Sequence, residues 1–247
     1  LLYIGVLARV RPALMPPDDV SGDEKVSIGR LLLLASGPLA LIIAVLGSIL
    51  MGIATPTEAA AVGAMGAILL ALISRQLTLE ALRDVVFRTT RVTAMVFMIL
   101  LGASLFSLVF RGFGGDEMIA DFLTALPGGV VTAMVLVMLV MFLLGFVLDF
   151  IEITFVVVPI VGPVLMAMGL NPIWLGVMIA LNLQTSFLTP PFGFSLFYLR
   201  GVSPDSVPTS AIYRGVVPFI AIQVLVLILL AFWPKLVTWL PGVVYPG

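Results

Sequence analysis

The side chains best suited to chemistry in this chain are two carboxylates, Asp149 and Glu152, which lie inside an apolar stretch. Ionisable groups at membrane depth are costly and commonly mark ion or substrate pathways. Their spacing also matches a helix cap followed three positions later by an acidic residue, so a structural role is the alternative. A carboxylate, free backbone carbonyls and a helix end at one buried turn would suit a hard cation such as sodium.

A second candidate is a cluster of neutral polar side chains that ends at a proline break. It comprises Asn182, Gln184, Thr185, Ser186 and Thr189, followed by Pro190, Pro191 and Gly193. Neutral oxygens and unwound carbonyls can bind a monovalent cation without holding it too tightly for release. Hydrogen bonds to neighbouring helices are the alternative role for the polar side chains. That alternative does not account for the break, so we expect a binding site here.

The segment Thr55 to Glu58 matches a capping box, with Pro56 at the first helical position. Thr55 and Glu58 are therefore expected to cap a helix, as Asp149 and Glu152 would if they are structural. The small residues from Ala59 to Ala67 form a helix face that permits close packing against a neighbouring helix. Glu58 and Glu152 could also support an ion site from behind its ligands.

Composition indicates the class of protein, and therefore the kind of element that must position these residues. Hydrophobic residues make up 62% of the chain and charged residues 10%, against about 25% charged in soluble domains. The chain is therefore expected to be an all-α, polytopic membrane protein. It has no Cys and no His, which excludes disulfides and most zinc sites. It also lacks a long basic run, which argues against nucleic acid as a partner.

The N-terminal part predicts scaffold helices. Residues 1–30 are expected to hold the end of a preceding helix and a polar linker, and 31–91 to hold two spans and an amphipathic helix at the membrane surface. The expected spans are Leu31–Thr57 and Ala59–Ser74, and the amphipathic segment is Arg75–Arg91. Because the chain begins Leu-Leu-Tyr, we expect a fragment that lacks its N-terminal part.

The rest of the chain predicts the elements that carry the candidate site. Residues 92–200 are expected to contain the span Val92–Phe110, the polar loop Arg111–Asp121, the helices Phe122–Leu144 and Phe150–Met168, and Pro172–Leu188, broken within 172–199. A final span, Val216–Trp233, follows within 201–247. Arg and Lys gather before residue 31, in 75–91 and in 200–214, which are expected to be cytoplasmic. Residues 122–168 must then form a re-entrant hairpin that turns at Gly145 to Asp149.

Two motifs carry a resemblance to a known family. The segments Gly52-Ile-Ala-Thr-Pro-Thr-Glu-Ala-Ala-Ala61 and Leu188-Thr-Pro-Pro-Phe-Gly-Phe-Ser-Leu-Phe197 closely resemble the large membrane subunit of tripartite ATP-independent periplasmic (TRAP) transporters. The stretch Gly145 to Gly169 is also similar to that family. The resemblance covers nearly the whole chain.

The resemblance implies a sodium-driven elevator transporter of the bacterial inner membrane, with this chain as its C-terminal inverted repeat. It implies uptake of a small organic acid, delivered by a periplasmic substrate-binding protein, with a small TRAP membrane subunit as a further partner and no cofactor apart from the coupling ions. By position, Gly145, Leu148 and Asp149 would contribute to ion binding, and Thr189, Pro190, Pro191 and Gly193 would supply carbonyl and hydroxyl ligands. Asn182, Gln184 and Thr185 are additions from their chemistry.

Two other functions fit parts of the sequence. An intramembrane aspartyl hydrolase needs two carboxylates on facing helices, whereas Asp149 and Glu152 are one turn apart on one helix. We therefore expect no enzyme. A purely structural membrane subunit is favoured if neighbouring helices satisfy every polar group at the breaks.

Overall fold

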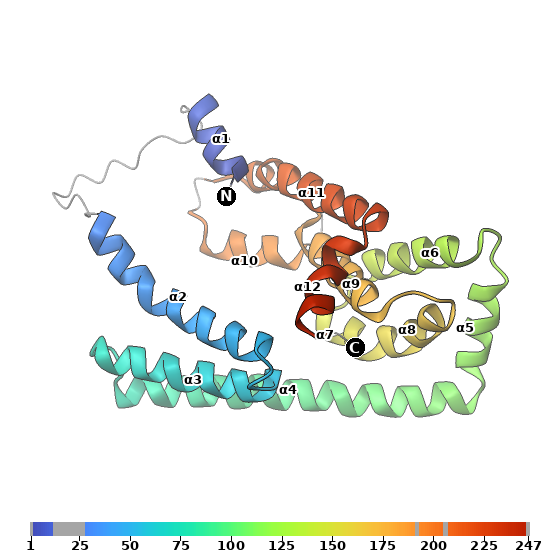
Figure 1. Ribbon diagram of the computed structural model, residues 1–247, viewed down its shortest axis with the longest axis horizontal. Coiled ribbons are helices and arrows are strands. Elements are labelled where there is room, and N and C mark those ends of the chain that lie inside the picture. The colour runs from blue at the N-terminus through green and yellow to red at the C-terminus, as the bar shows by residue number, and fades with distance from the viewer. Residues whose placement is uncertain (1, 12–27, 191–192, 205–206, 246–247) are drawn as a thin grey trace. The chain divides into compact units, whose positions relative to one another are not determined.

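The computed structural model describes residues 2–11, 28–190, 193–204 and 207–245, and all regular structure in these ranges is helical (Figure 1). This confirms the predicted all-α class. The helices, in chain order, are α1 (Leu2–Val10), α2 (Ile28–Leu50), α3 (Pro56–Ile73), α4 (Leu79–Gly112), α5 (Gly115–Thr124), α6 (Gly129–Leu144), α7 (Phe150–Glu152), the π-helix η2 (Ile153–Val157), α8 (Val158–Ala167), α9 (Pro172–Leu188), α10 (Phe194–Val202), α11 (Thr209–Phe232) and α12 (Lys235–Val244). Most of the linker predicted in 1–30 lies outside the described residues.

Length and composition make several of these helices able to cross a membrane. Within the described residues, four are long and apolar enough: Pro56–Ile73, Leu79–Gly112, the combined segment Phe150–Ala167, and Thr209–Phe232. Shorter apolar helices accompany them, including Gly129–Leu144 and Pro172–Leu188. The predicted polytopic membrane architecture agrees with this pattern.

The chain divides into two compact units, Leu1–Leu77 and Thr78–Gly247. In the first unit, α2 packs against α3 through the predicted small-residue face. A Cβ added to Gly66 would lie 2.3 Å from Leu41 Cδ1, and one added to Gly63 would lie 3.2 Å from Val45 Cγ2. Glycine is therefore what allows the two helices to approach so closely.

A capping box starts α3, as the sequence predicted. The Thr55 Oγ1 accepts a hydrogen bond from the Glu58 amide at 3.4 Å, and the Glu58 carboxylate accepts from the Thr55 amide at 2.8 Å and from its hydroxyl at 2.9 Å. Pro56 occupies the first turn, where its missing N–H costs nothing. The side chains of Thr55 and Glu58 therefore both take part in hydrogen bonds at the start of α3.

The second unit begins with a helix longer than expected. Thr78 caps α4 through a bond from the Ala81 amide, and the helix runs unbroken for 34 residues. The amphipathic segment Arg75–Arg91 and the span Val92–Phe110 are therefore not separate helices. No Pro or Gly occurs between Leu79 and Leu101, so nothing in the local sequence ends the helix at the change of polarity.

The predicted loop Arg111–Asp121 is also mostly helical. Only Phe113 and Gly114 separate α4 from α5, and Gly114 has a φ of 72°, which glycine adopts readily. The helix predicted at Phe122–Leu144 is likewise interrupted after Thr124, and α6 begins at Gly129. Pro127 and two glycines of positive φ, Gly128 and Gly129, account for the interruption.

The second arm of the predicted hairpin is irregular. It starts as α7, widens into η2, where the Val158 amide donates to the Ile153 carbonyl five residues back, and continues as α8. Pro159 and Pro163 lie on this arm and each removes a backbone donor. Single-turn π segments occur frequently at functional sites.

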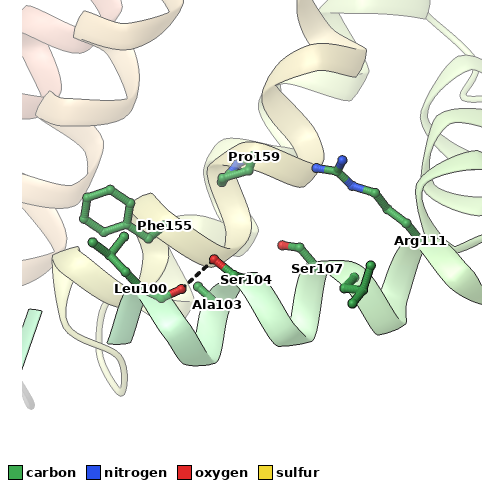
Figure 2. A pocket seen from close by; sticks show the side chains of 8 residues that line it. Leu100, Ala103, Ser104, Ser107, Arg111, Phe155 and Pro159 are labelled. Atoms are coloured by element: carbon green, nitrogen blue, oxygen red, sulfur yellow. Dashed lines mark hydrogen bonds between the residues drawn. The ribbon is translucent and has the colours of Figure 1, made fainter. Parts of the chain in front are cut away.

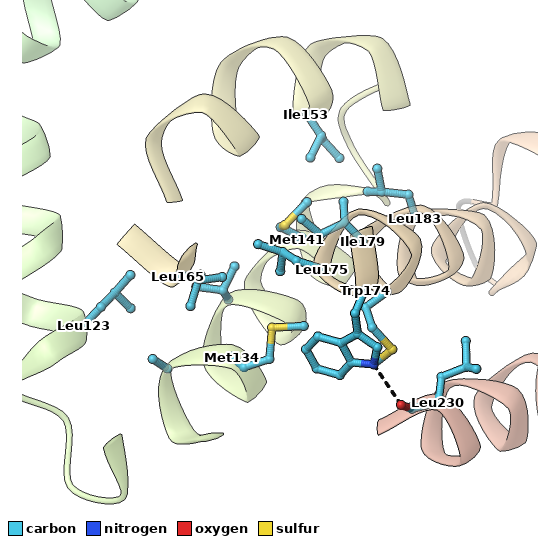
Figure 3. Close-up of a cluster of buried hydrophobic side chains, with 13 residues drawn as sticks. Leu123, Met134, Met141, Ile153, Leu165, Trp174, Leu175, Ile179, Leu183 and Leu230 are labelled. Carbon is cyan, nitrogen blue, oxygen red and sulfur yellow. Dashed lines mark hydrogen bonds between the residues drawn. The ribbon is translucent and has the colours of Figure 1, made fainter. Parts of the chain in front are cut away.

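Helix α9 forms the centre of the second unit. Its buried side chains join those of α6, the second hairpin arm and α11 in one apolar cluster (Figure 3). Trp174 contributes its ring to this cluster and donates from Nε1 to the Leu230 carbonyl of α11 at 2.8 Å. The last span starts at Thr209, earlier than the predicted Val216, and ends at Phe232. Helix α9 is thus held from several sides before it reaches its break.

Candidate functional site

The hairpin turns in the five residues, Gly145 to Asp149, that separate α6 from α7. The amide of Gly145 donates to the Met141 carbonyl at 2.9 Å, and the Leu148 amide donates to the Leu144 carbonyl at 2.8 Å. Asp149 then takes an extended conformation, with φ −71° and ψ 156°, and α7 starts. The predicted turn at Gly145 to Asp149 is where the two helices meet, and Leu148 packs, half-buried, against the main core.

Asp149 caps α7 but does not form the reciprocal capping box. Its Oδ1 accepts a hydrogen bond from the Phe150 amide at 2.8 Å, and the side chain is half-buried. Glu152 is also half-buried, one turn further on. A single cap bond uses one carboxylate oxygen of Asp149, so oxygen lone pairs remain that could bind a cation.

The hairpin turn packs directly on α9. A Cβ added to Gly145 would lie 2.1 Å from the Ser186 Oγ and 2.9 Å from the Ser186 Cβ. Beside this contact, the rings of Phe150 and Phe187 meet edge to face with centroids 6.1 Å apart. The structure therefore brings the hairpin turn against the last part of α9, just before the break.

Asn182 joins α9 to the first arm of the hairpin. The side chain is only 6% exposed, and its Nδ2 donates to the Met138 carbonyl of α6 at 2.9 Å. A polar group at this depth needs such a partner, because an unpaired one is costly to bury. Asn182 is therefore a link between helices in this structure.

The hydroxyls near the end of α9 all bond within their own helix. Thr185, Ser186 and Thr189 donate to the carbonyls of Leu181, Leu183 and Thr185 at 2.7, 2.8 and 2.7 Å. This arrangement is usual for Ser and Thr in apolar helices. It uses the hydroxyl protons and leaves the oxygen lone pairs free to act as ligands.

The predicted break follows Leu188. Thr189 is extended, with φ −89° and ψ 122°, and its carbonyl accepts a hydrogen bond from the Gly193 amide at 3.1 Å. A Cβ on Gly193 would lie 2.4 Å from the Phe187 carbonyl oxygen, so only glycine fits there. Pro190 is half-buried. Pro191 lies outside the described residues.

Gln184 does not face the hairpin turn. Its side chain is exposed and lines a cavity of about 840 Å³ together with residues of α10 and α11, among them Ser195 and Gln223. The predicted candidates thus divide into two groups. The first lies on the hairpin turn, on α9 or at its break: Gly145, Leu148, Asp149, Asn182, Thr185, Thr189, Pro190 and Gly193. Gln184 instead faces the cavity beside α10 and α11.

The sequence placed Ser186 in the polar cluster but did not indicate its contact with Gly145. The edge-to-face contact of Phe150 and Phe187 was not predicted, because a phenylalanine in an apolar segment gives no sign of its partner. The Met138 carbonyl carried no such signal, because any residue type supplies a carbonyl.

The ligand types in the cluster suit some ions better than others. Within the described ranges, no three carboxylate, histidine or cysteine side chains come together. The carboxylate of the turn and the hydroxyls and carbonyls of α9 are donors of the kind that suits a weakly held monovalent ion rather than zinc. The predicted sodium ligands Gly145, Asp149 and Thr189 stay predictions.

Comparison with known proteins identifies the family. Residues 6–236 match the family described as the DctM component of the tripartite ATP-independent periplasmic transporter. The chain belongs to this DctM family. Its members are multi-pass permeases of the inner membrane. This agrees with the four helical segments that are long enough to cross a membrane in the part of the chain that the structure describes, and with the expectation that the chain is not an enzyme.

Individual DctM relatives carry different substrate names. The chain is 30% identical to the sialic acid TRAP transporter large permease SiaM of Vibrio cholerae, over 80% of this chain and 46% of the relative. It is 30% identical to the C4-dicarboxylate permease DctM of Pseudomonas aeruginosa (83% and 48%) and 27% identical to the ectoine permease TeaC of Halomonas elongata (97% and 55%). The chain spans about half the length of these curated relatives.

Proposed function

We propose that the chain forms part of a large permease subunit that imports a small organic acid together with sodium. A periplasmic binding protein would deliver the substrate, and a small membrane subunit would complete the transporter. Membership of the DctM family supports this assignment, and the three relatives named above handle substrates that all contain a carboxylate.

One observation carries the proposal: Gly145 of the hairpin turn packs on Ser186, one helical turn before the break at Thr189. The turn that carries the capping carboxylate Asp149 thus packs against the end of α9 that carries the hydroxyls and the unwound carbonyls. Broken helices in transporters use such groups to bind coupling ions near the bilayer midplane.

The proposed mechanism follows from charge. Asp149 places a negative charge at the turn, and a sodium ion bound beside it would neutralise that charge. An organic anion could then approach without repulsion, which is strong where the surroundings are of low dielectric constant. Binding of the ion would thus favour binding of the substrate, and the hairpin and α9 would move together with both. In an elevator transporter, this movement carries the loaded site across the membrane.

The test is sodium-driven uptake by the assembled transporter in proteoliposomes. Thr189→Ala removes the hydroxyl and should reduce sodium-dependent uptake and raise the sodium concentration needed for half-maximal rate, whereas Thr189→Ser should retain both. Thr90→Ala is the matched control, because Thr90 makes the same type of bond to its own helix, from Oγ1 to the Val86 carbonyl, on an exposed face of α4. Unchanged sodium dependence in Thr189→Ala would count against this residue as a ligand.

A purely structural role is the second candidate. It is favoured by one observation: the hydroxyls of Thr185, Ser186 and Thr189 all have partners within α9. If that role is correct, Thr189→Ala should lower stability without altering the sodium dependence of the remaining uptake. The aspartyl hydrolase is not proposed, since the relatives are named as permeases.

A further inference from the structure

A groove with polar and apolar walls lies between α4 and the second hairpin arm (Figure 2). It consists of two adjoining cavities of about 420 and 260 Å³, which share Ser107, Arg111 and Pro159. We call it the α4/α8 groove. Its residues from α4 include Leu100, Ser104, Ser107 and Arg111, and across from them lie Phe155, Pro159 and Pro163; Phe110, Ile160 and Val164 add apolar surface near Arg111.

The α4 wall changes in polarity along its length. Its residues follow helical spacing, so they form one stripe on one face of the helix. Leu100 and Ala103 form the apolar end, Ser104 and Ser107 the middle, and Arg111 the charged end. The eleven steps from Leu100 to Arg111 correspond to about 16 Å, close to half of a hydrocarbon core of about 30 Å. The stripe therefore matches one leaflet of a bilayer.

The opposite wall contains backbone with reduced hydrogen bonding. Pro163 has no N–H, so the Pro159 carbonyl four residues earlier lacks its helical donor. Figure 2 shows Ser107 and Arg111 projecting from α4 toward the arm that carries Pro159. A hydrated or polar occupant is therefore favoured at this end of the groove, whereas Leu100 and Phe155 form an apolar end.

The charged end of the groove carries both signs. Arg111 Nε lies 3.8 Å from Asp116 Oδ2, and the two side chains are 64% and 48% exposed. This separation is too long for a hydrogen bond, so the fork of guanidinium donors stays available to a phosphate. Asp116 lines the same cavity. An anionic ligand alone would meet the Asp116 carboxylate, but a ligand with a phosphate and a nearby ammonium would match both groups.

We propose that the α4/α8 groove binds one phospholipid with a zwitterionic ethanolamine headgroup. The phosphate lies at Arg111, the ammonium at Asp116, the ester region at Ser107, and an acyl chain against Leu100 and Phe155. The Ser104 hydroxyl donates to the Leu100 carbonyl at 2.8 Å and so adds no donor for the ester. Acyl chain, ester and phosphate follow one another in such a lipid in the order of Leu100, Ser107 and Arg111 along the stripe, and Asp116 of α5 lies next to Arg111. The proposal is independent of sodium coupling and of the transported substrate.

The test is native mass spectrometry of the assembled transporter, delipidated and then titrated with phosphatidylethanolamine, phosphatidylglycerol or phosphatidylcholine. We expect one phosphatidylethanolamine to bind about tenfold more tightly than the other two lipids, a difference of about 1.4 kcal/mol. Arg111→Gln should abolish this preference. Asp116→Asn should weaken binding of phosphatidylethanolamine and leave that of phosphatidylglycerol unchanged or stronger.

Two further variants keep the result decisive. Ser107→Leu fills the middle of the groove without altering any charge, and it should release the lipid even if Arg111→Gln fails to fold. Arg88→Gln is the matched control, because Arg88 pairs with Asp84 at 2.8 Å on the same helix but outside the groove. This variant should bind phosphatidylethanolamine as tightly as the unchanged protein does. Equal binding of all three lipids, or binding unaffected by both Arg111→Gln and Ser107→Leu, would overturn the proposal.

Discussion

Gly145 in the hairpin turn lies so close to Ser186 of α9 that a methyl group at residue 145 would be 2.1 Å from the Ser186 Oγ. The backbone of Gly145, with φ −64° and ψ −7°, is one that any residue adopts. Glycine is needed here for space rather than for conformation. The hairpin turn and the end of α9 therefore behave as one packed element.

Gly145→Ala should destabilise this junction. Overpacking of this kind costs about 1–3 kcal/mol, so we expect a lower thermal midpoint and reduced uptake. Gly176→Ala, on α9 with nothing within 4 Å of its added Cβ, is the control and should be neutral or slightly stabilising. Adding Ser186→Gly to Gly145→Ala should recover part of the loss, and strict additivity of the two changes would contradict the contact.

Asn182→Leu should loosen α9 from the first hairpin arm. The variant loses the hydrogen bond to the Met138 carbonyl, and bonds between membrane helices are worth on average about 0.6 kcal/mol and at most about 1.7. The unfolding free energy of the transporter in detergent or bicelles measures the effect. Gln184→Leu, on the same helix but exposed, should change stability by less, and equal effects of the two variants would argue against the link.

Thr55→Val should weaken the start of α3. Loss of an N-cap hydroxyl costs about 0.5–2 kcal/mol, and Thr55 both accepts from the Glu58 amide and donates to the Glu58 carboxylate. Thr55→Ser retains these bonds and should be close to neutral. Circular dichroism during thermal unfolding can compare the two variants. A Val variant as stable as the Ser variant would show that the cap contributes little.

The Asp149→Asn variant distinguishes a capping role of Asp149 from a role as an ion ligand. Asparagine caps helices as well as aspartate does, so the bond from the Phe150 amide should survive and stability should change little. If the carboxylate binds sodium, uptake should lose its sodium dependence. Asp149→Ala should lose both stability and sodium dependence. Retained coupling in Asp149→Asn would leave Asp149 a structural cap.

Local sequence signals predicted the helix starts and breaks well. The capping box at Thr55 and the break after Leu188 both depend on residues adjacent in the chain, and both are confirmed. The prediction of one helix from Phe122 to Leu144 was wrong, because α5 ends at Thr124 and α6 begins at Gly129. The apolar composition of this stretch outweighed the turn signal of Pro127 and Gly128. The predicted boundary near Arg91 was also wrong, because polarity changes there without any helix-breaking residue.

The contacts that form the candidate site could not be predicted in this way. Gly145 meets Ser186 and Asn182 reaches Met138 across about 40 residues of chain, so their pairing depends on tertiary packing. A glycine in a turn and an asparagine in a helix can each have several structural roles, so the residue type alone does not identify its partner. The type of chemistry could thus be inferred from the sequence, whereas the partners of each residue required the structure.

The continuous helix α4 has a mechanical consequence. Its 34 residues extend about 51 Å, well beyond a hydrocarbon core of about 30 Å, so it must tilt or project from the bilayer. If a rigid helix of this length tilts by about 5° about one end, its other end moves by about 4 Å. A tilt imposed near Thr78 would therefore displace Arg111 and change the width of the α4/α8 groove.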